Sequence, residues 1–164
     1  MSISRSIKMG LRPLIIPILR ILKYYSLQTY YVEGDGGSLY SHETARLSNT
    51  VFNIESGNIF IGENTIFGYN SMVLTGTHQY KAAKRLSVHM AEKKEKVNLG
   101  SEVPRSGQDI KIGKNCWIAS GVIIIGKVQI GDSVIIASGS VVSKDIPSNT
   151  IAGGVPAKPI RANL

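Results

Sequence analysis

Residues 110–146 read IKIGKNCWIASGVIIIGKVQIGDSVIIASGSVVSKDI, and within them every sixth residue is aliphatic. The aliphatic positions of this phase are Ile112, Ile118, Ile124, Ile130, Ile136 and Val142. A second phase, four residues later in each repeat, holds small or branched side chains at Cys116, Val122, Val128, Val134, Ser140 and Ile146. A period of six matches neither the 3.6-residue period of a helix nor the two-residue alternation of a hairpin strand.

The six-residue period predicts a solenoid in which three short strands form one coil. Residues 18 apart then stack on consecutive coils, so Ile112 is expected next to Ile130 and Ile124 next to Val142. Each coil adds about 4.7 Å, the distance between hydrogen-bonded strands. The aliphatic side chains form the core, and glycine and small polar residues supply the corners. We therefore predict an all-β fold, a parallel β-helix of hexapeptide repeats.

The same phase occurs upstream at Ile61, Phe67 and Val73, and it is interrupted once. From Val73 to Ile112 there are 39 residues, which is one repeat plus an insert of 33. The insert begins directly after His78 and is too rich in lysine to pack a core of its own. Because long inserts in compact domains are usually functional or disordered, we expect residues 79–111 to form an extruded loop within a domain that covers residues 33–164.

Residues 1–32 have the pattern of a basic amphipathic helical arm. At helical pitch one face carries Ile7, Leu11, Leu14, Ile18, Leu22 and Tyr25, and the other carries Arg5, Lys8, Arg12 and Lys23. Pro13 and Pro17 must kink or split such a helix. Two interpretations stay open: the apolar stripe caps the open end of the β-helix, or residues 1–28 make a peripheral contact with a membrane.

The composition excludes several classes of protein. With 43% hydrophobic and 18% charged residues the chain can build a core, so wholesale disorder is excluded. Cys116 is the single cysteine, which excludes an internal disulfide framework. The net charge of +8 is concentrated in residues 1–32 and 79–109, which suits phosphate groups or lipid headgroups rather than a nucleic-acid partner. The sequence has neither a transmembrane-length apolar run nor a signal-peptide pattern, so we expect a cytoplasmic protein, at the inner face of the membrane if residues 1–28 bind lipid.

The segment from residue 110 to 161 resembles the C-terminal half of the hexapeptide-repeat acetyltransferases, with motifs most similar to those of the galactoside, maltose and xenobiotic enzymes. The motifs are CWIAS (116–120), SVVSKDIP (140–147) and GGVPAKPIR (153–161), and IGENTIFGYNSMVLTGTHQY (61–80) resembles the coil before the family's active-site loop. The resemblance covers about residues 50–162. It implies a left-handed β-helix, a homotrimer and acetyl-CoA as co-substrate, with no bound cofactor.

His78, in the motif TGTHQY, matches the histidine that acts as general base in this family. Acetyl transfer needs such a base because a hydroxyl attacks a thioester effectively only if its proton is removed in the transition state. Imidazole titrates near neutrality and suits this task. The position of His78 directly before the insert favours the same role, whereas His42 and His89 lack such a context. The sequence does not indicate which group orients His78.

The resemblance also assigns residues to acetyl-CoA. Ser120 matches the serine that lines the acetyl end, and Ser138 matches a small residue whose backbone contacts the pantetheine arm. Ser143 and Lys144 match a pair near the adenosine phosphates. Phosphates favour charge-assisted donors, so a lysine is suitable there.

Five further residues complete the predicted site. Lys158 and Arg161 match basic residues near the same phosphates, and Trp117 is expected to pack at the groove between subunits. Asn53 and Glu55 occupy the coil with which relatives contact sugar hydroxyls, so we predict that they bind the acceptor.

These assignments predict an acyltransferase: an acetyl-CoA-dependent O-acetyltransferase that modifies a sugar hydroxyl, in surface polysaccharide biosynthesis. The alternatives are an N-acetyltransferase of a nucleotide-linked amino sugar and an antibiotic O-acetyltransferase. A metal-dependent hydratase of the same fold would need three histidines on adjacent coils, but only His78 lies in the regular repeat, so no metal site is expected. A non-catalytic scaffold would not require His78 together with the three motifs.

Overall fold

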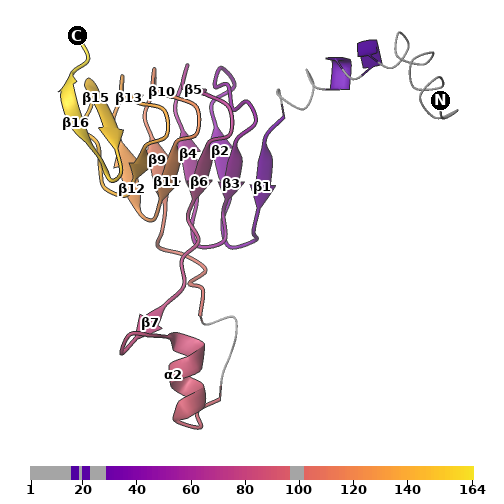
Figure 1. The fold of residues 1–164 in the computed structure, drawn as a ribbon, viewed down its shortest axis with the longest axis vertical. Helices are drawn as coiled ribbons and strands as arrows, with labels where there is room; N and C mark the ends of the chain where they lie inside the picture. The colour runs from indigo at the N-terminus through magenta and orange to yellow at the C-terminus, as the bar shows by residue number, and fades with distance from the viewer. Residues whose placement is uncertain (1–15, 19, 23–28, 97–101) are drawn as a thin grey trace, which may run out of the picture.

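The computed structural model describes residues 16–18, 20–22, 29–96 and 102–164, and its strands form the three faces of a prism (Figure 1). Face A consists of β1 (Tyr31–Glu33), β3 (Val51–Asn53), β6 (Met72–Leu74), β11 (Ile123–Ile125) and β14 (Val141–Val142). Face B consists of β2 (Leu39–Ser41), β4 (Ile59–Ile61), β9 (Ile110–Ile112) and β12 (Val128–Ile130). Face C consists of β5 (Ile66–Phe67), β10 (Trp117–Ile118), β13 (Ile135–Ile136), β15 (Thr150–Gly154) and β16 (Ala157–Ala162). The predicted all-β fold, a left-handed parallel β-helix, is confirmed.

The stacking predicted from the 18-residue spacing is confirmed. Ile112 pairs with Ile130 and Ile124 pairs with Val142, in parallel register and with buried side chains. The insert does not disturb this register, because Ile61 on the coil before it pairs directly with Ile112. Each coil therefore continues the hydrogen bonding of the previous one, whatever the chain does between them.

The core is a column of side chains from the two repeat phases, and all twelve positions of the quoted stretch are buried. Phe52 fills the N-terminal part of this column and is fully buried. Its ring contacts those of Tyr30 and Phe67 edge-to-face, with centroids 5.9 and 5.7 Å away. Aromatic pairs in this arrangement stabilise the fold beyond their burial.

The corners need unusual backbone conformations. Asparagine occupies left-handed positions at 49, 64, 70, 115 and 149, where its short polar side chain tolerates a positive φ. Asn49 Nδ2 donates to Asn70 Oδ1 at 2.7 Å and so links two coils. At Gly68 a Cβ atom would lie 2.4 Å from the backbone nitrogen of Ser120, so these two coils can stack only with glycine there.

The regular coils begin two residues earlier than predicted, at Tyr31. Tyr31 pairs with Val51 and Glu33 pairs with Asn53 in register. The boundary at residue 32 was wrong because β1 lies at the end of the prism and all three of its residues are exposed. An end strand of this kind has no buried apolar position, so the repeat pattern cannot reveal it.

Of residues 1–28 the structure describes 16–18 and 20–22, which are helical. Ile18 and Leu22, on the predicted apolar face, are 55% and 58% exposed in the single chain. The remaining predicted positions of that face, Ile7, Leu11, Leu14 and Tyr25, lie outside the described residues. Within the part of the chain that the structure describes, no helix is long and apolar enough to cross a membrane.

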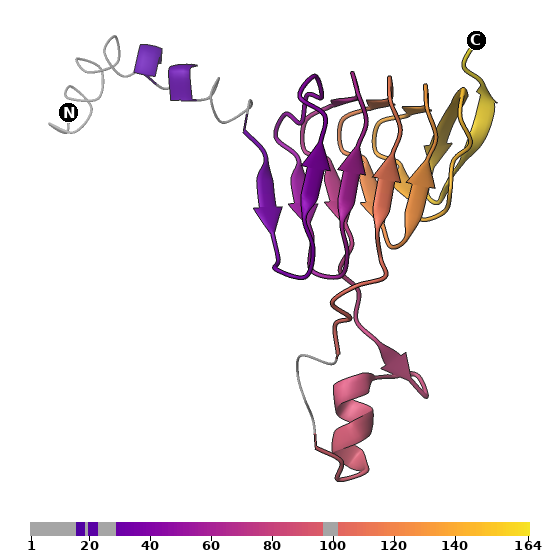
Figure 2. The same cartoon turned by 180° about the vertical axis from the view of Figure 1, so that it is seen from behind.

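The insert projects from one end of the strands, away from the prism (Figures 1 and 2). It contains the hairpin β7 (Tyr80–Lys81) and β8 (Lys84–Arg85), followed by α2 (Leu86–Glu92), which has no buried residue. The chain rejoins the prism at Gln108, whose N–H donates to the Ser56 carbonyl at 3.1 Å. The predicted end of the loop at residue 111 was therefore too late, because it was counted from Ile112 although β9 starts at Ile110.

Candidate active site

His78 lies beyond the corner between faces A and B, on the segment that leaves β6. The base of this segment is fixed: the hydroxyl of buried Thr75 donates to the Asn53 carbonyl at 2.9 Å and accepts from the Ser56 N–H at 3.1 Å. The Gly76 N–H donates to Asn53 Oδ1 at 3.1 Å. The backbone is thus anchored two residues before His78, whose imidazole is 56% exposed.

Glu102, on the returning limb of the loop, is the group that faces the imidazole. Its Oε1 lies 3.8 Å from His78 Nδ1 and 3.5 Å from Arg85 Nε. Its side chain is 7% exposed, and Oε1 is buried without a hydrogen bond among the described residues. The Gln79 N–H donates to the Glu102 carbonyl at 2.8 Å, which ties the two limbs together beside the histidine. Catalytic hydrogen bonds often shorten only when substrate binds, so a carboxylate at this distance can orient an imidazole.

Glu102 is not among the site residues that the sequence predicts. It lies twenty-four positions after His78, inside an insert that has no repeat, so no spacing rule connects the two residues. Only the pairing of the two limbs brings them together.

A second cluster of charges closes the base of the loop. Arg105 forms ion pairs with Asp35, from the turn after β1, and with Glu55, whose Oε1 lies 3.7 Å from Arg105 Nη1. Asn53 Oδ1 accepts from the Glu55 N–H at 3.2 Å. The two predicted acceptor residues, Asn53 and Glu55, therefore lie at the same corner as His78, and the amide oxygen of Asn53 is already used to hold the backbone.

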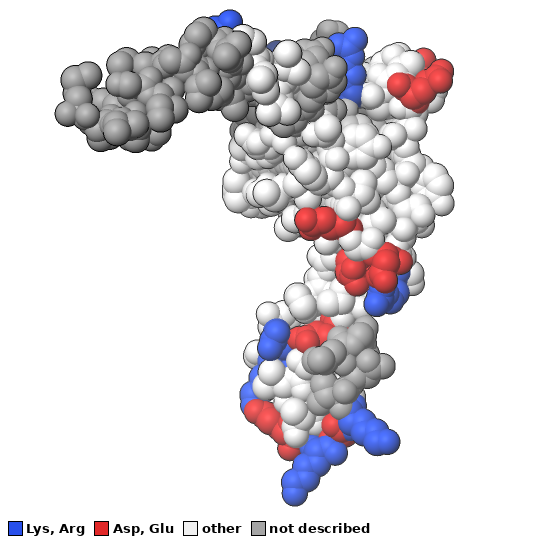
Figure 3. All heavy atoms as spheres, turned by 90° about the vertical axis from the view of Figure 1, so that its right-hand side faces the viewer, with Lys and Arg blue, Asp and Glu red and all other residues white. Residues whose placement is uncertain are grey.

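Acidic groups gather where the loop joins the prism, and at the far end of the loop lysine and arginine side chains extend outward with acidic groups among them (Figure 3). Two arginines accompany the carboxylates at the junction, Arg85 beside Glu102 and Arg105 beside Glu55. Most of the negative charge beside His78 is therefore paired within the chain.

Ser120, predicted at the acetyl end of acetyl-CoA, and Ser138, predicted at its pantetheine arm, lie at a different corner. Both follow strands of face C and precede strands of face A, and they stack, with the Gly139 N–H donating to the Ser120 carbonyl at 3.0 Å. Six-residue repeats give faces roughly 15–20 Å wide. Face A therefore separates these serines from the corner of His78 within one chain.

The residues predicted near the adenosine phosphates form two exposed groups. Ser143 and Lys144 follow β14 at the corner between faces A and B, on the same edge of the prism as His78 but on later coils. Lys158 and Arg161 lie on β16, the antiparallel strand that closes the C-terminal end of face C. Both are exposed, and Arg161 Nη1 donates to the Ala162 carbonyl at 3.3 Å.

Trp117 is 49% exposed on face C, paired between Ile66 and Ile135. It belongs to a row of apolar side chains that point outward along face C, formed by Ile66, Trp117, Ile135 and Ile151. Face A has a similar outward row, formed by Tyr31, Val51, Met72, Ile123 and Val141.

Two other chemistries have no support in the described residues. Burial raises the pKa of the Cys116 thiol, whose Sγ contacts the Gly131 carbonyl at 3.1 Å, so this cysteine is no nucleophile at neutral pH. No group of three or more His, Cys, Asp or Glu side chains suited to a metal ion occurs in residues 29–96 and 102–164.

Comparison with known proteins identifies the repeat. Residues 109–144 match the family described as Bacterial transferase hexapeptide (six repeats). A galactoside O-acetyltransferase from Lactococcus lactis is 32% identical over 103 residues, which is 63% of this chain and 42% of that protein. The chain spans about half the length of the curated relatives that it matches.

Solved structures have the same architecture. A maltose O-acetyltransferase from Clostridium difficile is 31% identical with a TM-score of 0.52, over 82% of this chain and 67% of that chain. A hexapeptide-repeat acetyltransferase from Vibrio cholerae, solved in complex with acetyl-CoA, has a TM-score of 0.55 over 88% of this chain and 78% of that chain. Its sequence identity is 22%, so this likeness concerns the fold alone.

Proposed function

The chain belongs to the hexapeptide-repeat acetyltransferase family, and from this premise we propose that it transfers an acetyl group from acetyl-CoA to a hydroxyl of a sugar. The observation that carries the proposal is the His78 imidazole, held beside the buried Glu102 carboxylate on the loop that leaves the β-helix. Relatives that act on galactosides and on maltose support a sugar as the acceptor.

In the proposed reaction His78 is the general base. Nδ1 faces Glu102, which leaves Nε2 for the acceptor. The acceptor hydroxyl loses its proton to Nε2 as its oxygen attacks the thioester carbonyl carbon. When the tetrahedral intermediate collapses, the C–S bond breaks and the imidazolium returns the proton to the thiolate of coenzyme A. Glu102 acts as a positioning residue, because it holds the ring and favours the imidazolium as it forms.

We assign acetyl-CoA to an elongated surface that two neighbouring chains form together, because Ser138 and Lys144 lie on opposite edges of face A within one chain. Ser120 and Ser138 would meet the acetyl and pantetheine parts, and Lys144, Lys158 and Arg161 would meet the phosphates. Ser143 accompanies Lys144, and Trp117 would pack against the edge of the groove. Glu55 and Asn53 would contact acceptor hydroxyls beside His78.

The assembly that we propose is a homotrimer. Within one chain, His78 and the serine corner lie on opposite edges of face A, so a second chain must complete the site. The outward apolar rows favour a contact between face A of one chain and face C of another. In the single chain, Met72 on face A is 41% exposed and Trp117 on face C is 49% exposed. Burying them stabilises the assembly by about 25 cal/mol for each Å² of apolar surface removed from water. Contact between two different faces generates a closed ring when the rotation is three-fold.

A screen of acceptors tests the activity. Purified protein with acetyl-CoA should release free thiol in the presence of a mono- or disaccharide with free hydroxyls, such as maltose or a galactoside. Preference for a nucleotide-linked amino sugar or an antibiotic would replace the sugar O-acetyltransferase assignment. If no acceptor led to thiol release, the proposed acetyltransferase activity would be refuted.

The physiological acceptor that we propose is a sugar of a surface polysaccharide, modified at the inner face of the membrane. Its support is the basic arm, which has exposed Ile18 and Leu22 on its apolar face. Deleting residues 1–28 should abolish binding to vesicles that contain phosphatidylglycerol and leave turnover of a soluble acceptor unchanged. Co-sedimentation at low salt and a thiol assay measure the two effects. Loss of folding or of trimers would instead show that the arm caps the β-helix.

A further inference from the structure

Face B differs from the other two faces in the side chains that it presents outward. At the centre of its four strands, in register, are Tyr40, Phe60, Lys111 and Gln129. Faces A and C carry mainly aliphatic side chains at the equivalent positions, and the proposed trimer would cover these. Face B thus offers aromatic and hydrogen-bonding groups at a regular interval of about 4.8 Å per coil.

The aromatic part of face B is a pair of rings stacked on one another, so each ring covers one face of the other. The rings of Tyr40 and Phe60 stack with centroids 5.0 Å apart and an angle of 9° between their planes. Tyr40 is 54% exposed, so the outer part of this stack is accessible to solvent. Lys111 Nζ lies 5.9 Å from the centroid of Phe60, so the lysine continues the row by a cation–π contact.

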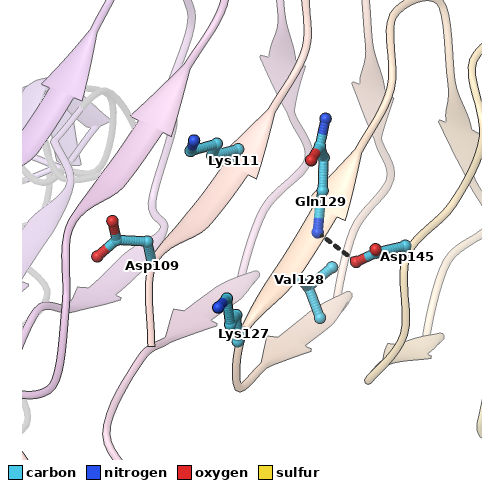
Figure 4. A pocket seen from close by; sticks show the side chains of 6 residues that line it. All are labelled: Asp109, Lys111, Lys127, Val128, Gln129 and Asp145. Carbon is cyan, nitrogen blue, oxygen red and sulfur yellow. Dashed lines mark hydrogen bonds between the residues drawn. The ribbon is translucent and has the colours of Figure 1, made fainter. Parts of the chain in front are cut away.

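The row continues into a depression of about 360 Å³, which is lined by Asp109, Lys111, Lys127, Val128, Gln129 and Asp145 (Figure 4). Asp109 Oδ1 accepts from the Asn58 N–H at 2.8 Å, and Asp145 Oδ1 accepts from the Gln129 N–H at 2.7 Å. The ammonium groups of Lys111 and Lys127 make no ion pair with a described carboxylate. Two lysines and two aspartates line the depression, so their formal charges balance and it offers both hydrogen-bond donors and acceptors.

The aromatic rings and the charge-balanced depression together indicate which class of ligand face B can bind. A polyanion would meet two carboxylates, and a polycation would meet two ammonium groups. A neutral polyhydroxylated ligand instead finds donors and acceptors for its hydroxyls, and the outer face of the Tyr40 ring for the C–H face of one of its sugars. An oligosaccharide of uncharged sugars has these properties.

Face B also adjoins the proposed acceptor corner. Asn58 follows Glu55 by three positions. Its backbone N–H donates a hydrogen bond to the Asp109 side chain, where the loop rejoins the prism. Phe60 is five residues from Glu55, so their Cα atoms are at most about 18 Å apart. A single glycan chain can therefore reach both places.

We propose that face B binds the non-reacting units of an extended, uncharged glycan whose terminal sugar is acetylated at His78. The inference rests on the proposed sugar acetylation and extends it from a small sugar to a chain. The outer face of Tyr40 stacks against a sugar ring, Phe60 supports the Tyr40 ring from behind, and Lys111 and Gln129 hydrogen-bond the hydroxyls of the neighbouring units.

Oligosaccharide binding tests the proposal without relying on catalysis. Maltoheptaose, cellohexaose and chitohexaose are titrated calorimetrically into the full chain, with a hyaluronan oligosaccharide as the charged comparison. At least one neutral chain should bind. The Tyr40→Ala/Phe60→Ala variant should bind it about tenfold more weakly, as expected for the loss of the Tyr40 stacking contact together with the ring that supports it. Tyr40→Phe, which keeps the ring, and Lys114→Ala, which changes an exposed lysine outside face B, should bind normally.

Several outcomes would overturn the proposal: no binding of any neutral chain, equal binding by the double alanine variant, or preference for hyaluronan. Thermal unfolding of each variant shows whether the β-helix is intact, and Lys111→Ala supplies a second test if the double variant does not fold. Acetylation of maltose without oligosaccharide binding would retain the proposed function and remove face B from it. Binding without acetylation of any sugar would retain face B as a glycan site and remove the proposed function.

Discussion

Replacing His78 with alanine should lower kcat by roughly 10²–10⁴-fold, the range usual for the loss of a general base. The reason is that no other described imidazole faces Glu102 at the base of the loop. The affinity for acetyl-CoA should change little, because the imidazole acts on the proton of the acceptor. A thiol-release assay gives kcat, and calorimetry with coenzyme A gives the affinity.

Two further variants make the result specific. His42→Ala removes an exposed imidazole whose Nδ1 pairs with Thr44 Oγ1 at 2.9 Å, far along the chain from the loop, and should keep full activity. Glu102→Gln keeps the shape of the side chain but not its charge, so kcat should fall by less than in His78→Ala, with an unchanged KM for acetyl-CoA. Turnover of His78→Ala within a few-fold of the unsubstituted protein would remove His78 from the mechanism.

Two inactive variants should restore activity to one another when they assemble together. His78→Ala removes the proposed general base at one edge of face A. Ser138→Trp blocks the proposed acetyl-CoA surface at the other edge. If each site combines His78 of one chain with the serine corner of its neighbour, random trimers of the two variants hold both intact parts in about a quarter of their sites. The mixture, unfolded and refolded together, should therefore recover about a quarter of the activity of the unsubstituted protein.

A matched pair shows that the recovery comes from complementation. Ser120→Trp and Ser138→Trp alter the same corner on consecutive coils, so their mixed trimers contain no intact serine corner and should stay inactive. If the complete site lay within one chain, the first mixture would also stay inactive. A monomer by light scattering at micromolar concentration would contradict the trimer itself.

The sequence alone predicted the prism because a β-helix is nearly one-dimensional. Each coil contacts only the coils before and after it, so a local period fixes which residues stack. Ile112 and Ile130, eighteen residues apart, pair as expected, and the same arithmetic brings Ser138 above Ser120. The period also located the insert directly after His78, and the motif there indicated a catalytic role.

The period could not describe the places where it is absent. Tyr31–Glu33 have no buried position, so the first coil was assigned in part to the arm. Glu102 and Arg105 lie in the insert, and their contacts with His78, Asp35 and Glu55 arise only from the way its two limbs meet.

What the sequence determined by itself, then, concerns the side chains that point inward: they set the fold class and the register across the insert. The tertiary structure decided the outward half, including the partner of the imidazole, the apolar rows on faces A and C and the stacked Tyr40 and Phe60 on face B. The physical reason is that burial imposes a strict repeat on side chains that point inward. Side chains that point outward follow no such repeat. Their functional role depends on which residues the neighbouring coils place beside them.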